Sequence, residues 1–246
     1  MSNIEYAKRL KEGLTLETPP VAVKFLRAEE TPPEGFPVPA KKMRFCQAIM
    51  EAGWGKTQTI IPADLACGPG PGYFGLPMKE KVAKGEVHQA TGLFETAGAA
   101  SRSLAGNVKM MSGTAASVMV GPLDKFPVQP DTVVLKTNAE QAMWIVHSRS
   151  YSEGKHLMLE VQTEGSFCSG VSVAAHVKGE IQIGFGCFGS RSFTNMGPNE
   201  MLVGIPFSLL PKVVDTLEKL KKPIEAERGK KGFYESYPEM KPAQQT

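Results

Sequence analysis

The four cysteines constrain the fold of this 246-residue chain more than any other feature, because they fall into two stretches of similar make-up. Cys46 and Cys67 bound the first stretch and are 21 residues apart (67 − 46), whereas Cys168 and Cys187 bound the second and are 19 residues apart (187 − 168). Each stretch begins with a Phe-Cys pair and ends with a cysteine beside small residues. We interpret the two stretches as halves of one site, whose ligands come together from distant segments.

The motifs around the cysteines recur in the same order in both parts of the chain. A run predicted to form a strand comes first, then the Phe-Cys pair, then the second cysteine, and then a short apolar run with Gly and Pro. We therefore expect an α+β fold of two similar halves, an internal duplication about a pseudo-two-fold axis; chance similarity is the competing explanation. The predicted units are a first half (1–125) carrying Cys46 and Cys67, a second half (126–222) carrying Cys168 and Cys187, and a polar C-terminal tail (223–246).

Hydrophobic periodicity and turn residues predict the main elements. The run from Cys67 to Tyr73 holds three glycines and two prolines, so we expect an irregular loop whose backbone N–H groups can approach a bound group closely. The polar, Pro-containing chain after Glu225 predicts a loosely held tail. The spacing predicts helices at 2–13, 139–147 and 208–222, strands at 21–26, 132–136 and 156–163, and a hairpin of 171–176 with 180–185.

Composition and charge argue against several classes of protein. A net charge of +3 is small for this length and argues against a dedicated nucleic-acid binder. The N-terminus lacks the pattern of a secretory signal, and no uncharged apolar stretch approaches the roughly 20 residues of a membrane helix. We therefore expect a cytoplasmic protein with no membrane partner, in which thiols stay reduced and cysteines more often bind metal than form disulfides. The sequence does not decide between a monomer and an oligomer, because a two-fold repeat can mimic an ancestral homodimer.

The cysteines by themselves leave several interpretations open. Four thiolates round a point suit an iron–sulfur cluster or a zinc ion, but the chain has no C-x-x-C pair of the kind that marks structural zinc sites. Reduced, buried cysteines that act as small hydrophobic residues are common in cytosolic proteins. Two interpretations remain. One is a catalytic thiol, and the other is a pair of disulfides, Cys46 with Cys67 and Cys168 with Cys187.

Several motifs in order resemble the DUF169 family over about residues 10–220. These are Arg44-Phe45-Cys46-Gln47-Ala48, Ala66-Cys67-Gly68-Pro69-Gly70, the strand starting at Pro130, Gln141-Ala142-Met143, Phe167-Cys168-Ser169, and Cys187-Phe188-Gly189-Ser190-Arg191 followed by Glu200 and Ile205-Pro206. The resemblance implies that all four cysteine positions belong to the family's pattern, which favours a [4Fe–4S] cluster over inert thiols. It also implies an origin in anaerobic bacteria or archaea. The family has no assigned reaction, so no catalytic residue is carried over.

Two arginines are candidates for holding an anionic ligand. Arg191 follows the second cysteine stretch, and Arg102 ends an Ala-rich segment. For each of them a solvated or core-capping role is the simpler interpretation. The four histidines show no metal-ligand spacing.

These observations predict a redox protein with one [4Fe–4S] cluster held by Cys46, Cys67, Cys168 and Cys187. Complete ligation by four cysteines favours electron transfer, with a redox partner protein, or a structural role. The first alternative is a small-molecule enzyme or binding protein, whose pocket between the halves would hold an anion through Arg102 or Arg191. The second is a zinc-stabilised protein of unknown role. Whether the chain is an enzyme is left open.

Overall fold

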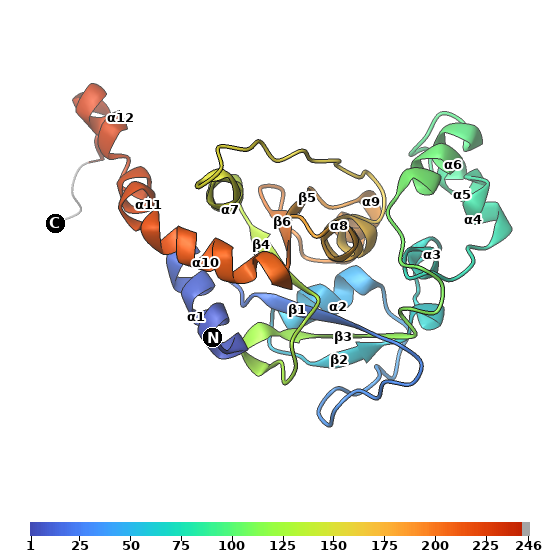
Figure 1. Ribbon diagram of the computed structural model, residues 1–246. Coiled ribbons are helices and arrows are strands. Elements are labelled where there is room, and N and C mark those ends of the chain that lie inside the picture. The colour runs from blue at the N-terminus through green and yellow to red at the C-terminus, as the bar shows by residue number, and fades with distance from the viewer. Residues whose placement is uncertain (243–246) are drawn as a thin grey trace.

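A six-stranded antiparallel sheet forms the centre of the computed structural model, which describes residues 1–242 (Figure 1). The predicted α+β class is confirmed. The strands are β1 (Val21–Leu26), β2 (Gln58–Ile60), β3 (Ser117–Pro122), β4 (Thr132–Thr137), β5 (Gln182–Gly184) and β6 (Met201–Pro206), in the spatial order β2-β3-β1-β4-β6-β5.

Each half of the chain contributes three strands in an equivalent order. Moving inward from one edge come β2, β3 and β1, and from the other edge β5, β6 and β4. The halves join where β1 and β4 pair over three residues, from Val21 opposite Val134 to Val23 opposite Thr132. This order is the one that two similar halves about a pseudo-two-fold axis would produce. Descent of both halves from one ancestor stays a prediction.

The two halves also share the way in which their last strands end. The N–H of Leu123, just after β3, donates to the carbonyl of Pro20, just before β1 (2.8 Å). The N–H of Phe207, just after β6, donates to the carbonyl of Asp131, just before β4 (3.0 Å). A short 3-10 turn follows each strand, at Leu123–Lys125 and Phe207–Leu209. The similarity of motif order in the sequence therefore has a counterpart in hydrogen bonding.

Three helices cover one face of the sheet: α1 (Asn3–Leu14), α7 (Ala139–Ser150) and α10 (Leu210–Lys219), of which α1 and α10 are clearly amphipathic. Side-chain oxygens of Ser2 and Asn138 accept backbone N–H groups at the starts of α1 and α7, which satisfies donors that have no partner within the helix. Leu210, Val213, Val214 and Leu217 recur at helical spacing on α10 and are buried. The apolar stripes of the three helices meet the sheet in one core cluster.

The opposite face carries the segments that bear Cys46 and Cys168. They are α2 (Phe45–Ala52) and a π-helix, η3 (Ser166–Val173), which continues into α8 (Ala174–Lys178). The second core cluster lies between these elements and the sheet, and both Phe45 and Phe167 are fully buried in it. The two Phe-Cys pairs therefore anchor one element from each half to the same face.

The remaining helices are short, and several lie away from the sheet. Figure 1 shows α4, α5 and α6 as a group at one edge of the molecule and α12 at the other. The first group comes from the extra residues that follow the second cysteine of the first half. These helices are α3 (Gly70–Tyr73), α4 (Glu80–Ala83), α5 (Glu86–Ala90), α6 (Ala97–Gly106), α9 (Phe188–Phe193), α11 (Lys221–Arg228) and α12 (Lys231–Ser236).

A predicted strand, a predicted hairpin and the predicted tail differ from the structure. The strand predicted for 156–163 is absent: these residues pair with no strand of the sheet, and Met158 is 87% exposed. Hydrophobic and polar residues alternate there, but no neighbouring strand is available for pairing. The hairpin predicted for 171–185 is wrong, since residues 166–178 are helical and only 182–184 form a strand. The predicted tail is largely helical as far as Ser236. Pro223 does not prevent this, because it falls in the first turn of α11, where a backbone N–H has no partner within the helix. Residues 243–246 lie outside the described part.

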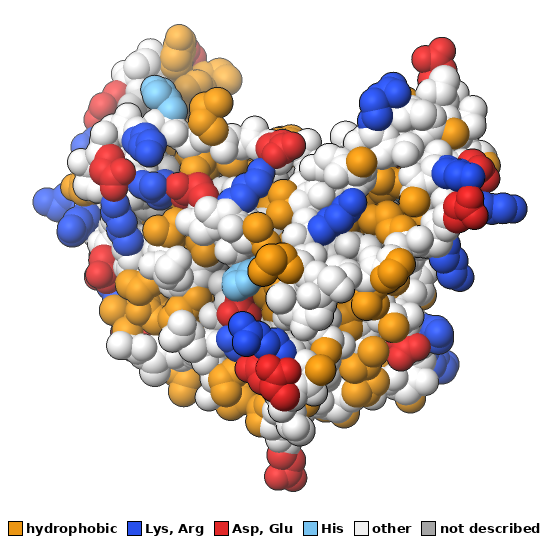
Figure 2. All heavy atoms as spheres, turned by 45° about the vertical axis from the view of Figure 1, so that its right-hand side comes forward, with side chains coloured by type: hydrophobic (Ala, Val, Ile, Leu, Met, Phe, Trp, Pro, Cys, Tyr) orange, Lys and Arg blue, Asp and Glu red, His pale blue; other side chains and the backbone are white. Residues whose placement is uncertain are grey.

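Acidic and basic side chains are interspersed over the face shown in Figure 2, with hydrophobic side chains between them. This pattern agrees with the small net charge of the sequence. Over residues 1–242, none of the helices combines the length and the apolar character needed to cross a bilayer.

Candidate functional site

All four cysteines line one chamber of about 350 Å³ between the two halves. Cys46 comes from α2 and Cys168 from η3, whereas Cys67 precedes α3 and Cys187 caps α9. The structure thus brings the four cysteines to one cavity, and their role as ligands of a shared site stays a prediction. This cysteine chamber is lined by Arg44, Phe45, Cys46, Cys67, Gly68, Pro69, Val87, His88, Thr91, Leu93, Glu164, Gly165, Phe167, Cys168, Cys187, Phe188, Gly189, Ser190 and Phe193.

The cysteines differ in depth in the same way in both halves. The first cysteine of each stretch, Cys46 or Cys168, is 7% exposed and packs in the core cluster. The second, Cys67 or Cys187, is half-buried and lies nearer the surface. All four are free thiols in the structure, so neither of the two suggested disulfides is present.

Short helical turns hold the two outer cysteines. The thiol of Cys187 accepts the backbone N–H of Ser190 (3.4 Å), and the Ser190 hydroxyl in turn accepts the N–H of Cys187 (2.9 Å). The N–H of Gly70, at the start of α3, donates to the carbonyl of Cys67 (3.2 Å), and it also lowers the pKa of the Cys67 thiol. The glycine-rich run therefore contains one helical turn where an irregular loop was expected, and its backbone still favours the Cys67 thiolate. Such donors stabilise negative charge on a thiolate.

Burial disfavours the thiolate forms in the chamber as it stands. It raises the pKa of Cys46 to about 12, with Cys187 and Cys67 adding to the rise. It raises the pKa of Cys168 well above the usual value, and the three other cysteines contribute. The thiols are therefore near enough to repel one another when charged. A cation or cluster in the chamber would reverse this balance, because metal binding displaces thiol protons.

Arg44 supplies a positive charge to the chamber and was not predicted as a site residue. Burial raises the pKa of Cys67, whereas the guanidinium of Arg44 acts in the opposite direction through charge and a hydrogen bond. The guanidinium also stacks on the ring of Phe193, 3.8 Å from its centroid, which holds it over the chamber. Arg44 directly precedes the Phe-Cys pair, so its position beside the first cysteine was the only signal in the sequence.

A buried His–Glu pair forms part of the chamber wall and was also missed. Nε2 of His88, on α5, lies 3.5 Å from a carboxyl oxygen of Glu164, and both side chains are less than one-tenth exposed. Burial raises the pKa of Glu164 to about 7 and lowers that of His88, so near neutral pH His88 is neutral and Glu164 still holds its proton for a substantial part of the time. Asn107 fixes this segment by donating to the Glu164 carbonyl (3.1 Å) and to the Tyr73 hydroxyl (3.0 Å).

The four thiols line the chamber without meeting at one point. Within residues 1–242, no three His, Cys, Asp or Glu side chains are gathered closely enough to hold one metal ion. A zinc ion binds its ligands at about 2.0–2.3 Å, so the four sulfurs would have to move in toward one point. A [4Fe–4S] cluster is bulky and bonds each thiolate through a different iron, which suits thiols distributed round a chamber wall. Gly68, Gly165 and Gly189 contribute backbone to that wall.

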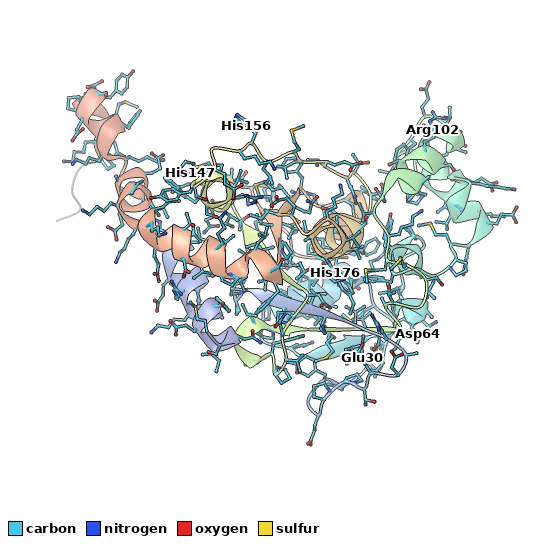
Figure 3. The ribbon with its side chains drawn as sticks, in the orientation of Figure 1. Glu30, Asp64, Arg102, His147, His156 and His176 are labelled. Atoms are coloured by element: carbon cyan, nitrogen blue, oxygen red, sulfur yellow. The ribbon has the colours of Figure 1, made fainter. Side chains whose placement is uncertain are left out.

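The two arginines predicted to bind an anion lie outside the chamber. Arg191 donates to the backbone carbonyls of Phe185, Gly197 and Glu200, so most of its N–H groups hold the chain around α9. Arg102 is exposed on α6, at the edge of the molecule (Figure 3). These contacts favour the simpler structural roles, and anion binding by either residue has no support beyond the sequence. Figure 3 also shows His147, His156 and His176 well apart.

Comparison with known proteins gives a family but no activity. The model of the DUF169 family, described as "Uncharacterised ArCR", matches residues 9–216. An "Uncharacterized protein MJ0308" from the archaeon Methanocaldococcus jannaschii is 27% identical over 218 residues, which cover 87% of this chain and 93% of that protein. No solved structure matches the chain.

Proposed function

Because the chain belongs to the DUF169 family, whose members share no assigned reaction, we propose its function from the chemistry of the cysteine chamber. The proposal is that Cys46, Cys67, Cys168 and Cys187 bind one [4Fe–4S] cluster. The observation that carries it is the convergence of all four cysteines of the chain, as free thiols from both halves, on one chamber.

The surroundings of the thiols support a negatively charged, oxygen-sensitive group. Apolar side chains form most of the wall, with Phe45 and Phe167 at the base, so water is largely kept away. The backbone N–H of Ser190 donates to the Cys187 sulfur, and Gly70 and Arg44 both lower the pKa of the Cys67 thiol. Hydrogen bonds to sulfur, nearby charge and burial are the features by which proteins set the potential of a cluster.

When bound, a cluster of this kind accepts and donates single electrons. Four cysteines would fill its four iron positions, so we favour electron transfer or a structural redox role over chemistry at an open iron. Arg44 would stabilise the reduced, more negative state and so raise the reduction potential. Phe188 and Phe193, which line the chamber and are at least half exposed, are the residues nearest solvent through which an electron partner would approach.

A small-molecule enzyme is the second candidate, and the His88–Glu164 pair is the observation that favours it. A carboxyl group whose pKa lies near 7 can act as a general acid at neutral pH, and Glu164 lies on the wall of a largely apolar cavity. An anionic group would then meet Arg44. This candidate differs from the first in that it needs no iron.

The test is the metal content of protein purified without oxygen. We expect about four irons and four acid-labile sulfides per chain, with a visible absorbance that dithionite bleaches. Each of the variants Cys46→Ser, Cys67→Ser, Cys168→Ser and Cys187→Ser should lose at least half of that iron. Ser169→Ala is the matched control, because its hydroxyl sits next to Cys168 yet donates to the Val108 carbonyl (2.6 Å).

The outcomes separate the candidates. Colourless protein that stays free of iron after reconstitution would overturn the cluster proposal. Stoichiometric zinc in that protein would point to a zinc-stabilised fold, and protein without metal would leave the enzyme candidate. Loss of iron in Ser169→Ala equal to that in Cys168→Ser would show that folding of η3, rather than the thiol, is being measured.

A further inference from the structure

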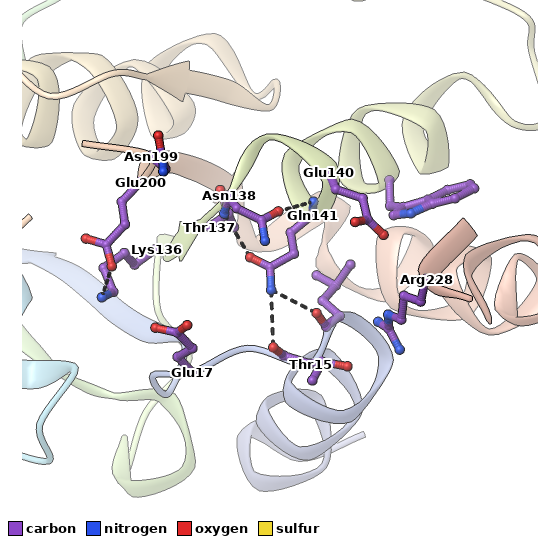
Figure 4. Close-up of a pocket in the computed structure, with 12 residues that line it drawn as sticks. Thr15, Glu17, Lys136, Thr137, Asn138, Glu140, Gln141, Asn199, Glu200 and Arg228 are labelled. Carbon is purple, nitrogen blue, oxygen red and sulfur yellow. Dashed lines mark hydrogen bonds and ion pairs between the residues drawn. The ribbon is translucent and has the colours of Figure 1, made fainter. Parts of the chain in front are cut away.

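A polar pocket of about 400 Å³ lies at the end of β4 and shares no lining residue with the cysteine chamber. It is formed where the C-terminus of α1, the N-terminus of α7, the segment before β6 and the end of α11 meet (Figure 4). We call it the strand-end pocket and describe it by its charged residues, Glu17, Lys136, Glu140, Glu200 and Arg228. Its volume is in the range of small-molecule sites, about 300–1,000 Å³.

Hydrogen bonds hold the walls of the strand-end pocket in place. The amide of Gln141 donates to the carbonyls of Leu14 (3.0 Å) and Thr15 (3.2 Å), which ties α7 to the end of α1. The same side chain accepts the N–H of Asn138 (2.8 Å) in a reciprocal cap of α7. Thr15 adopts a left-handed conformation (φ 53°), which this side chain-to-backbone bridge helps to maintain. The pocket is therefore formed before any ligand enters.

The charges in the pocket are only partly neutralised. Lys136 and Glu200 form an ion pair, so they cancel each other. For Glu17, Glu140 and Arg228, no ion pair is found among residues 1–242. Arg228 donates once, to the Gly13 carbonyl (2.6 Å), which leaves most of its guanidinium N–H groups available.

The arrangement of these charges selects the class of ligand. Figure 4 shows Glu140 and Arg228 toward one end of the pocket, with Glu17 and the Lys136–Glu200 pair toward the other. A simple anion would meet Glu140 and Glu17 as well as Arg228, and a simple cation would meet Arg228. A molecule with both charges close together satisfies Arg228 and Glu140 at once.

We propose that the strand-end pocket binds a free α-amino acid. Arg228 takes the α-carboxylate, since a guanidinium matches a carboxylate with two parallel hydrogen bonds. Glu140 takes the α-ammonium group. The side chain then points toward Glu17, Asn138 and Asn199, where polar groups are favoured. The proposal does not depend on the cluster, because the two sites have no residue in common.

The test is isothermal titration of the full-length protein with each of the twenty amino acids, and with the N-acetyl and carboxamide derivatives of those that bind. We expect at least one free amino acid to bind with a Kd between about 10 μM and 1 mM. Removing either of its charges should weaken binding at least tenfold. Arg228→Gln and Glu140→Gln should each do the same.

Lys222→Gln, at an exposed position near the start of α11, and Glu29→Gln, in an exposed loop, are the controls and should bind as the wild type does, since neither residue lines the pocket. Three results would overturn the proposal. They are a Kd above about 10 mM for every amino acid, equal binding of a free amino acid and its single-charge derivatives, and unchanged binding by Arg228→Gln and Glu140→Gln.

Discussion

At the scale of single residues, Glu164 shows how surroundings decide the state of a side chain. Its partner within 4 Å is His88, which burial keeps neutral, and the chamber around both is largely apolar. A carboxylate there would have little water and no fixed positive charge beside it, so the pKa of Glu164 rises to about 7. Since burial also keeps His88 uncharged near neutral pH, the pair is a neutral imidazole beside a carboxyl group that titrates near pH 7, and it is not an ion pair.

This pKa makes folding stability depend on pH in a defined direction. Since the folded pKa of about 7 exceeds the ordinary 4.5, the folded chain holds a proton that the unfolded chain has lost between these values, and stability falls as pH rises through them. Glu164→Gln has no ionisable group at this position, so it should not lose stability in this way as the pH rises. Relative to the wild type, the metal-free variant should gain up to about 3 kcal/mol between pH 4.5 and pH 8, measured by urea unfolding.

His88 acts in the opposite direction, because its lowered pKa costs stability as pH falls below about 6.5. His88 is present in both the wild type and the Glu164→Gln variant, so the difference between their unfolding free energies reports on Glu164. Glu160→Gln, on the same segment but exposed and paired with Lys178, should change by less than about 0.5 kcal/mol over the range. A Glu164→Gln difference that stays constant with pH would contradict a raised pKa.

At the scale of elements, the π-helix η3 is the part that the sequence pattern misrepresented. Val171 and Val173 favour a strand, yet the segment is buried on all sides between the sheet and α2, so contacts rather than propensity decide its form. The N–H of Gly170 reaches back to the carbonyl of Gly165 (3.0 Å), and the Ser172 hydroxyl donates to the carbonyl of Phe167 (2.7 Å). Wide turns of this kind are often found at functional sites, and here the wide turn carries Cys168.

Close packing of η3 on β6 depends on the absence of a side chain at Gly204. A Cβ at Gly204 would overlap the carbonyl oxygen of Val171. Gly204→Ala should therefore destabilise the protein by about 3 kcal/mol or more, because both contacting groups are backbone in well-packed elements. Chemical unfolding monitored by circular dichroism measures this.

Gly232→Ala is the control, since a Cβ there meets nothing within 4 Å and the residue lies inside α12. It should leave stability unchanged or raise it slightly. A loss below about 1 kcal/mol in Gly204→Ala would show that η3 can move away from β6 at little cost.

Much of the site could be predicted at this scale, and the reason lies in the pairing of motifs. Two Phe-Cys pairs in equivalent positions placed Cys46 and Cys168 on equivalent elements, and the cysteine that follows each completed the set. His88 could not be found in the same way. It belongs to α5, in a segment that has no equivalent in the second half, so no pattern connected it with the cysteines. Its position beside Glu164 follows from tertiary packing alone.

At the scale of the whole molecule, the two halves form one structure rather than two domains side by side. Each core cluster draws on both: Leu10 and Ile145 share one, and Phe45 and Phe167 share the other. The sheet crosses from one half to the other at β1 and β4. The boundary near residue 125 therefore separates similar parts of the sequence without separating hydrophobic cores.

Shared cores predict that the halves unfold together. Scanning calorimetry and circular dichroism of the metal-free protein should give one transition with the same midpoint, and the calorimetric and van't Hoff enthalpies should agree. Two resolved transitions, one of them retaining the near-ultraviolet signal of Trp144 from the second half, would contradict this expectation.

The division of the chamber between the halves also orders events during synthesis on the ribosome. Cys67 is made 101 residues before Cys168 (168 − 67), and Cys187 follows later still. During that interval the nascent chain holds two thiols whose partners have not yet been translated. Under the proposed function, the full set of four ligands exists only once Cys187 has been made, so a cluster would be loaded after that point and not while Cys46 and Cys67 stand alone.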